Sequence, residues 1–525
     1  MKGLIFSVAA LFFCALLFFS VRLTRLEDVF SQQRPTFLDS DAYTRMERVR
    51  QMEKNNWLPI RFHDFENAPH GIVSHATSPL DYAILFVSLP LRLFWDAESA
   101  RDLAGVWISP LVGFLGLVML WRLLQGEPGR WWALLAYSAF PAIAWSQNIA
   151  RPDHQSLLVV LLTLALVAES MMLRGRKSRR MEFFCGAAWG FALWVSLWEP
   201  LILLVVLFLL QSVLKKASWL NRTRAFFLPL VVLIVLRFVI DPWPPIPERA
   251  DAVYLQNWGR LVGELRGSTV VEMLYWTGFW VPALFVFCLF VLRDSENRND
   301  AIFLLSLLVL LTVLTFWQIR WSAYLAALIA SVGVTVFFRT GVRPRKIFLA
   351  AISFVMIPLY YAQSALQWRQ PAEGIAESHK VAAILAKEPG TVLAPWWISP
   401  MLGYLSGSRY VASSSHQSIS GIVDVSEFFL TPHWEVARNI LIDRDVVWIV
   451  TAEPERMFAQ SLAVARGLYV PADEKALQKD VSYRVAMGTR LARGVLPETD
   501  ELYLKAVLGS YRVYRFLPRT GGVEP

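Results

Sequence analysis

The sequence predicts a polytopic α-helical membrane protein with a soluble α/β-type domain at its C-terminal end. Hydrophobic residues make up 55% of the chain, and many form unbroken runs long enough to cross a hydrocarbon core of about 30 Å. These runs lack the alternation of barrel strands, and only helices or closed barrels satisfy their backbone inside lipid. We therefore expect a transmembrane helical domain at 1–365, with outer loops at 22–102 and 241–275, and a soluble domain at 366–525.

The apolar runs predict about eleven transmembrane helices. The first run has the length of a signal peptide, but no small-residue cleavage site follows it, so we expect a retained anchor. The segment 80–94 is apolar but short and contains Pro90, so we expect a helix lying on the outer surface of the membrane. The predicted transmembrane helices occupy residues 3–21, 103–124, 131–147, 156–173, 181–198, 201–214, 225–240, 276–292, 301–316, 321–338 and 347–363.

Basic residues determine the predicted orientation. They gather in three loops, 174–180, 215–224 and 339–346, which fall on one side of the membrane when the predicted helices alternate. Loops rich in Lys and Arg stay in the cytoplasm, so we place all three loops and the N-terminus there. We therefore expect a protein integral to the cell (inner) membrane, with its outer loops and its C-terminal domain extracytoplasmic, in the periplasm.

The composition excludes two other kinds of site. The formal net charge is +9, but the basic residues cluster in short loops where the positive-inside bias explains them, so we expect no nucleic-acid binding. The cysteines Cys14, Cys185 and Cys288 all lie in apolar runs, so we expect neither a disulfide framework nor a thiolate metal site.

Beyond residue 368 the chain becomes a mixture of polar and apolar residues. Two short pieces, 391–394 and 446–451, have the β-branched character of strands and lie between helix-like segments. This alternation predicts an α/β-type domain.

Carboxylates in the first outer loop are the first candidate functional residues. Asp39 and Asp41 stand two residues apart, directly before a helical pattern that contains Glu47. Such a pair can cap the helix, or it can bind a metal ion or act as a base. Both interpretations stay open at this point.

Two more acids lie on the same predicted face. Asp153 occupies the short turn 150–155 between two predicted membrane helices, where an ionisable residue is costly to desolvate and often functional. It is equally well placed to cap the helix that follows. Glu272 lies near the end of the Pro-rich outer loop, which suits a lid or binding loop, and a solvated surface glutamate is the alternative.

Arg320 lies at the outer rim of the predicted bundle between Trp317 and Trp321. Its guanidinium can snorkel to the interface, or it can bind a lipid-borne phosphate with its fixed fork. Glu199 is a further candidate on this face, although Pro200 already explains its corner as a helix break. Three loops with oxygen donors and one arginine together suit a hard divalent cation beside a phosphate leaving group.

The order of these motifs resembles the catalytic subunits of oligosaccharyltransferases, which are membrane glycosyltransferases of the GT-C type, along the whole chain. Asp41 begins Asp-Ala-Tyr, which is similar to the family's Asp-x-Tyr/Trp motif in the first outer loop. Residues 153–155, Asp-His-Gln, resemble its second, Asp-x-Asp-type motif. Residues 269–272, Thr-Val-Val-Glu, resemble its Ser/Thr-x-x-Glu motif, and Arg320 falls where the family keeps an arginine for the lipid-linked (pyro)phosphate.

Two departures from the family pattern affect what the resemblance implies. Gln155 stands where the family usually has Asp, Glu or His, so metal coordination there is expected to be weaker or shared differently. Trp396 and Trp397 match the start of the family's Trp-Trp-Asp-Tyr-Gly motif, but the Asp and Tyr of that motif are missing, and Ser399 and Pro400 cannot supply a carboxylate. We still expect Trp396, Trp397 and Ser399 to bind the acceptor; a hydrophobic contact between the soluble domain and the bundle is the alternative for the two tryptophans.

The resemblance implies transfer of a sugar or oligosaccharide from a polyprenyl (pyro)phosphate donor to an acceptor outside the cytoplasm. Asp41, Asp153 and Glu272 would surround Mg²⁺ or Mn²⁺, and Arg320 and His154 would hold the donor phosphate. Asp41 and Glu272 would also orient or deprotonate the acceptor.

The identity of the acceptor separates the remaining hypotheses. The resemblance favours a protein asparagine, and the same donor chemistry with a lipid or polysaccharide acceptor is the first alternative. The expected partners are thus a polyprenyl-linked glycan donor, a protein or glycolipid acceptor, and membrane lipid. A non-enzymatic transporter or scaffold is the second alternative, although the sequence shows no charge in mid-helix and no pair of broken helices of the kind that transporters use.

Overall fold

The structure is a computed structural model that describes residues 2–176, 178–214, 222–241, 243, 251–293, 297–339 and 372–519. Its contacts divide the chain into two compact units, each built from three segments. Unit 1 contains Met1–Glu27, Thr77–Asp241 and Gly263–Arg369, and unit 2 contains Asp28–Ala76, Pro242–Val262 and Gln370–Pro525. The division groups parts of both predicted outer loops with the C-terminal residues, whereas the sequence-based boundary assigns them to the transmembrane domain.

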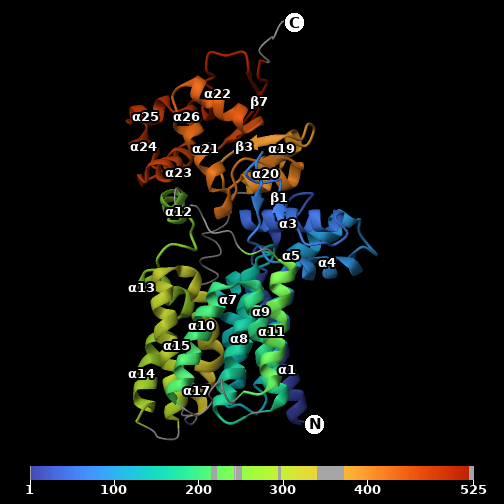
Figure 1. The fold of residues 1–525 in the computed structure, drawn as a ribbon, viewed down its shortest axis with the longest axis vertical. Coiled ribbons are helices and arrows are strands. Elements are labelled where there is room, and N and C mark those ends of the chain that lie inside the picture. Colours follow the sequence, from blue (N-terminus) through green and yellow to red (C-terminus); the bar gives the residue numbers. More distant parts are fainter. Residues whose placement is uncertain are drawn as a thin grey trace. The chain divides into compact units, whose positions relative to one another are not determined.

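Unit 1 is a bundle of helices that run side by side (Figure 1). Helix α8 is buried along most of its length and packs against α5, α9 and α16. The helices of unit 1 are α1 (Lys2–Arg22), α4 (Pro79–Leu91), α5 (Ala97–Leu123), α6 (Arg130–Ala139), α7 (Pro141–Ser146), α8 (His154–Leu173), α9 (Arg179–Val195), α10 (Trp198–Leu214), α11 (Arg224–Ile240), α13 (Val270–Thr277), α14 (Trp280–Val291), α15 (Arg298–Trp317), η3 (Ile319–Trp321), α16 (Ser322–Leu328), η4 (Ile329–Gly333) and α17 (Val334–Arg339).

Four helical spans in the described part of the chain are long and apolar enough to cross a membrane: Ala97–Leu123, His154–Leu173, Arg298–Trp317 and Ile319–Arg339. Helices α13 and α14 form a fifth candidate if the pair, bent by 85°, is one broken span. Shorter apolar helices cover Ser7–Arg22, Pro79–Leu91 and Trp198–Ser212. The predicted helix at 347–363 lies outside the described residues, and the predicted total of about eleven crossings stays a prediction.

The predicted helix at 131–147 is broken in the structure. Phe140 has an extended backbone between α6 and α7, and Pro141 begins α7. A proline cannot donate to the preceding turn and forces the residue before it out of the helical region, so the break follows from the sequence.

The turn between α7 and α8 is anchored to two neighbouring helices. The buried side chain of Arg22, at the end of α1, donates to the Gln147 side chain at 2.9 Å. The backbone N–H of Ile149 donates to the Arg22 carbonyl at 3.3 Å, and that of Ala150 donates to a carbonyl of α5 at 2.8 Å. These bonds hold the chain in the position from which Asp153 starts α8.

Unit 2 is built around a five-stranded mixed sheet in the order β4-β3-β5-β7-β6. Strand β3 is parallel to β4 and β5, whereas β7 is antiparallel to β5 and β6. The predicted strands at 391–394 and 446–451 are both present. The strands are β3 (Thr391–Leu393), β4 (Arg409–Tyr410), β5 (Val446–Thr451), β6 (Leu502–Leu508) and β7 (Tyr511–Phe516).

Helices cover both faces of this sheet because the side chains of a strand alternate between its faces. Trp448 and Val450 of β5 pack with α19 and α20, while Ile449 packs in a second core with α21, α22, α23 and α26. The other elements of unit 2 include a two-stranded hairpin, and α2 lies at the boundary between the units in the sequence. They are α2 (Leu26–Val29), α3 (Ser40–Lys54), β1 (Phe62–His63), β2 (Ile72–Val73), α12 (Ala252–Gly259), α19 (Ala372–Leu385), α20 (Ser399–Ser406), η5 (His416–Ser418), α21 (Ile419–Leu430), α22 (Trp434–Asp443), α23 (Pro454–Arg466), α24 (Glu474–Leu477), α25 (Val481–Val485) and α26 (Met487–Ala492).

Candidate functional site

Asp153 is the N-cap of α8, and its carboxylate also has other polar neighbours. One carboxylate oxygen accepts the backbone N–H of Gln155 at 3.3 Å, which is the N-cap bond expected from the sequence. The same oxygen lies 2.7 Å from Nδ1 of His154, and the other lies 3.5 Å from the guanidinium of Arg151. The carboxylate is nearly buried, so these polar neighbours are the groups that offset its desolvation.

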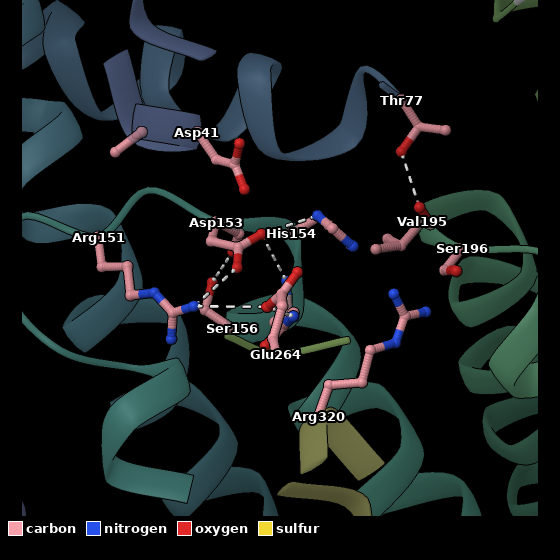
Figure 2. Close-up of polar contacts among 12 residues, drawn as sticks. Asp41, Thr77, Arg151, Asp153, His154, Ser156, Val195, Ser196, Glu264 and Arg320 are labelled. Atoms are coloured by element: carbon pink, nitrogen blue, oxygen red, sulfur yellow. Dashed lines mark hydrogen bonds and ion pairs between the residues drawn. The ribbon is translucent and has the colours of Figure 1, made fainter. Parts of the chain in front are cut away.

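Glu264, in the loop before α13, is the second carboxylate at this turn, and the sequence analysis did not single it out. Its Oε2 accepts the Gln155 side-chain amide at 2.7 Å and lies 3.9 Å from the Arg151 guanidinium. Figure 2 shows the guanidinium of Arg151 pointing toward Asp153 and Glu264, with dashed lines to both. Burial and the nearby charge of Asp153 raise the pKa of Glu264 above its ordinary value, although the side chain keeps about a third of its exposure.

Glu272 has a local structural role in unit 1. It is the third residue of α13 and forms a capping box with Thr269, whose N–H and hydroxyl both donate to Oε2 of Glu272, at 2.9 and 3.1 Å. The guanidinium of Arg266 donates to Oε1 of Glu272 at 2.5 Å. Both oxygens of this carboxylate are therefore occupied by donors from the same loop.

Arg320, in η3, is paired with Glu199. Its guanidinium donates to the carboxylate of Glu199, which is 1% exposed and also accepts the hydroxyl of Ser196. Pro200 lies in the first turn of α10, where a missing backbone N–H leaves no helical bond unmade, and Glu199 is buried in the same turn. Arg320 is about a quarter exposed, so part of its guanidinium is accessible from outside the protein, although its Nε is buried.

The loop before α13 also fixes the backbone of Arg320. The N–H of Arg320 donates to the Glu264 carbonyl at 3.2 Å, and the N–H of Ile319 donates to the Arg266 carbonyl at 2.9 Å. The loop thereby connects the Asp153 turn with the segment that bears the predicted phosphate ligand.

Asp41 belongs to unit 2, in the first turn of α3. The neighbouring Asp39 supplies the helix cap, because its Oδ1 accepts the N–H of Ala42 at 2.8 Å. The exposed Asp41 accepts the hydroxyl of Ser414. Asp39 therefore takes the cap role that the sequence left open for the pair, and the metal or base role of Asp41 stays a prediction.

The Trp396-Trp397 motif packs inside unit 2. The ring of Trp396 lies edge-on to that of Trp258 in α12, with centroids 5.8 Å apart, and the guanidinium carbon of Arg456 lies 4.4 Å from the ring centroid of Trp397. Ser399 is fully buried, and its hydroxyl is within hydrogen-bonding distance of the carbonyls of Ala394 and Pro395, at 3.0 and 3.1 Å.

The carboxylates of unit 1 match the donor set that Mg²⁺ or Mn²⁺ prefers. Among the described residues, no three His, Cys, Asp or Glu side chains are grouped so that they could hold a metal ion. Mg²⁺, however, is commonly bound by one or two carboxylates together with substrate phosphates, and Asp153 and Glu264 offer two hard oxygen donors at one turn. The oxygen chemistry of this pair suits such an ion, and a substrate phosphate would have to supply further ligands.

The sequence of this chain matches no protein-family model, and no curated protein matches it. Its fold, in contrast, is similar to that of several solved structures. The archaeal oligosaccharyltransferase AglB from Archaeoglobus fulgidus, in complex with an inhibitory peptide and a dolichol-phosphate, matches with a TM-score of 0.70 at 11% identity, over 95% of this chain and 79% of that one.

Two further structures extend the comparison. The A. fulgidus enzyme in complex with Zn and sulfate gives a TM-score of 0.70 at 12% identity, over 94% of this chain and 78% of that one. ArnT from Cupriavidus metallidurans, bound to undecaprenyl phosphate, gives 0.54 at 12% identity, over 98% of each chain. Identities this low establish the fold alone. The chain has the fold of these structures, which is the GT-C fold that the motif resemblance predicted.

Proposed function

We propose that the chain is a membrane glycosyltransferase that moves a sugar or oligosaccharide from a polyprenyl (pyro)phosphate to an acceptor outside the cytoplasm. The observation that carries the proposal is the match of nearly the whole chain to two GT-C proteins, one solved with dolichol-phosphate and the other with undecaprenyl phosphate. In this proposal the protein is integral to the cell membrane, with a cytoplasmic N-terminus and an extracytoplasmic C-terminal domain.

The residues have separate roles in the proposed reaction. A divalent cation, Mg²⁺ or Mn²⁺, would offset the charge that develops on the departing phosphate. Asp41, Asp153 and a carboxylate of the outer loop, which the motif resemblance assigns to Glu272, would provide oxygen ligands for it. Arg320 and His154 bind the phosphate, because a guanidinium keeps several N–H donors after pairing with one carboxylate. Asp41 and the outer-loop carboxylate orient the acceptor or take its proton.

Two kinds of acceptor fit this donor chemistry. The motif resemblance and the likeness to AglB, solved in one structure with a tethered acceptor peptide containing an NVT sequon, favour a protein asparagine. A lipid or polysaccharide acceptor is the second candidate, and the surroundings of Ser399 favour it. The Ser399 hydroxyl is buried against carbonyl groups, so it does not replace the carboxylate that the family motif offers to a sequon. Trp396 and Trp397 remain the proposed acceptor-binding residues in either case.

The decisive experiment measures glycan transfer by the full-length protein in lipid nanodiscs. A polyprenyl-pyrophosphate-linked oligosaccharide and a polyprenyl-phosphate-linked sugar serve as donors, and an Asn-x-Thr peptide and a glycolipid serve as acceptors. Transfer to either acceptor supports the proposal, and mass spectrometry of the product identifies the acceptor. Ion-coupled flux without glycan transfer would instead identify a transporter. If the protein shows neither transfer nor flux, a scaffold is the hypothesis that remains.

A pair of aspartate variants tests the residue assignment. Asp153→Asn retains an N-cap, since asparagine caps helices as well as aspartate does, but loses the charge, so we expect transfer to fall by at least about 100-fold. Asp96→Asn is the matched control because Asp96 caps α5 in the same way, accepting the N–H groups of Glu98 and Ser99. Transfer at the wild-type rate by both Asp41→Asn and Asp153→Asn would show that the assignment is wrong.

A further inference from the structure

The outer loop before α13 carries two carboxylates with opposite surroundings. Oε1 and Oε2 of Glu272 receive three hydrogen bonds, one from Arg266 and two from Thr269, and the two from Thr269 belong to the cap of α13. A metal ion would have to displace bonds at both oxygens. The contacts described for Glu264, with Gln155 and Arg151 of the Asp153 turn, are both at Oε2.

Gln155 explains why Glu264 can approach this turn. In oligosaccharyltransferase-like motifs the position usually carries Asp, Glu or His, and a second carboxylate there would repel Glu264. The amide of Gln155 instead donates to Oε2 of Glu264 at 2.7 Å. The turn has an amide at position 155 where the family motif usually has Asp, Glu or His, and the loop supplies a carboxylate at position 264.

The backbone of the loop keeps Glu264 in this place. Three N–H groups bridge the loop and the segment that bears Arg320: Arg320 to the Glu264 carbonyl at 3.2 Å, Ile319 to the Arg266 carbonyl at 2.9 Å, and Ser268 to the Phe316 carbonyl at 3.3 Å. Gly267 permits the close approach, because a Cβ at this position would lie 3.0 Å from the Phe316 carbonyl oxygen.

We propose that Glu264 is the outer-loop carboxylate that works beside Asp153 on the divalent cation, that Gln155 holds it there, and that Glu272 instead maintains the loop as the cap of α13. This inference rests on the proposed function, and it assigns the metal-binding role of the outer loop to Glu264 in place of Glu272. It also accounts for Gln155, the departure from the family pattern, as one half of a compensating pair.

The test measures Mn²⁺ binding to the purified full-length protein in nanodiscs by electron paramagnetic resonance, with the metal as the only probe. Glu264→Gln is expected to weaken Mn²⁺ binding by about 10-fold to 100-fold. Glu272→Gln, which retains hydrogen-bonding capacity at the cap, is expected to stay within about threefold of wild type. Glu427→Gln is the matched control, since Glu427 has the same 32% exposure as Glu264 and also pairs with an arginine, Arg466.

A double variant that exchanges the two side chains distinguishes the loss of a metal ligand from misfolding. In the double variant Gln155→Glu/Glu264→Gln the amide and the carboxylate trade places across the same contact, so we expect Mn²⁺ affinity to return to within about fivefold of wild type. Wild-type affinity in Glu264→Gln, loss of binding in Glu272→Gln as large as in Glu264→Gln, failure of the exchange, or the absence of Mn²⁺ binding by the wild type would each overturn the inference. Glu264-dependent Mn²⁺ binding without glycan transfer from any polyprenyl donor would support this inference and refute the proposed function.

Discussion

The pairing of Arg320 with Glu199 fixes the orientation in which the arginine would bind a donor. Arg320 is fixed through its side chain by a buried carboxylate and through its N–H by the loop, so its guanidinium fork is oriented before the donor arrives. Lysine offers a point charge and no fork. We expect Arg320→Lys to raise the KM for the lipid-linked donor by about tenfold, with a smaller change in kcat.

Donor titrations at saturating acceptor check this prediction. Arg466→Lys is the control, because Arg466 also donates to a carboxylate, that of Glu427 in unit 2. An unchanged donor KM in Arg320→Lys would show that Arg320 only neutralises the carboxylate of Glu199 and does not bind the donor through its fork.

His379 makes the stability of unit 2 sensitive to acid. Burial, together with the charge of Arg34, lowers the pKa of His379 from 6.5 to about 4, and its Nε2 lies 3.0 Å from the Thr36 hydroxyl. Between these two values the unfolded chain binds a proton that the folded chain does not, so stability falls as the pH drops from 6.5 and the loss is complete below about 4. Because the ring is partly exposed, we expect roughly 1 to 3 kcal/mol.

Thermal unfolding of the detergent-solubilised protein at pH 7.5 and pH 4.5 measures this effect. His379→Gln keeps a hydrogen-bonding group toward Thr36 and cannot be protonated, so we expect a smaller fall in Tm than in the wild type. The exposed His70→Gln serves as the control. An equal fall in His379→Gln and the wild type would contradict the assignment.

For single residues, the sequence singled out those that stand in a local motif and passed over those whose partners are far away in the sequence. The sequence singled out Asp153 because it stands in a short turn between two apolar runs. Glu264 was missed because its contact with Gln155 joins residues 109 positions apart, and its loop has no period that distinguishes one acid from another. Glu199 was undervalued because Pro200 explained the helix break without the charge.

Two helices of unit 1, α9 and α11, depend on glycine for their close approach. A Cβ on Gly186 would lie 2.1 Å from the Phe226 carbonyl oxygen, and one on Gly190, a turn later, would lie 3.0 Å from the Leu233 side chain. Small residues four positions apart allow the backbones of membrane helices to approach closely. Gly186→Ala must therefore push the helices apart, at a cost of about 1 to 3 kcal/mol.

A fall in the Tm of the solubilised protein would report this cost. Gly374→Ala is the matched helical control, because a Cβ on Gly374 meets nothing within 4 Å and alanine favours the helix. If Gly186→Ala left the Tm unchanged, the packing of α9 against α11 would not depend on this glycine.

Helix existence was easier to predict than helix continuity. The run predicted at 156–173 is α8, His154–Leu173, because an uninterrupted apolar run leaves no competing structure. The run predicted to start at 276 belongs instead to two helices, α13 and α14, bent by 85° around Gly278, whose φ is +64°. Such a bend depends on a backbone conformation that glycine permits but does not require, so the sequence alone could not fix it.

On the scale of the whole molecule, the long outer loop is divided between the two units. Residues 252–262 pack with unit 2, where Trp258 is 4% exposed and joins the core that contains Trp396. Residues 264–268 are bonded to the segment of unit 1 that bears Arg320. The composition of the loop gave no sign of this division, because its two halves become distinct only through contacts with residues far away in the sequence.

The division predicts that the two halves of the loop respond separately to mutation. Trp258→Ala removes a large buried side chain, which should cost about 3 kcal/mol locally in unit 2. We therefore expect faster hydrogen exchange in 252–262 and in the adjoining helices α21 and α23, with 264–268 unchanged. Trp243→Ala, at a residue 55% exposed, is the control and should change neither segment. Faster exchange of 264–268 in Trp258→Ala would show that the halves open together, and the loop would then couple unit 2 to the Asp153 turn.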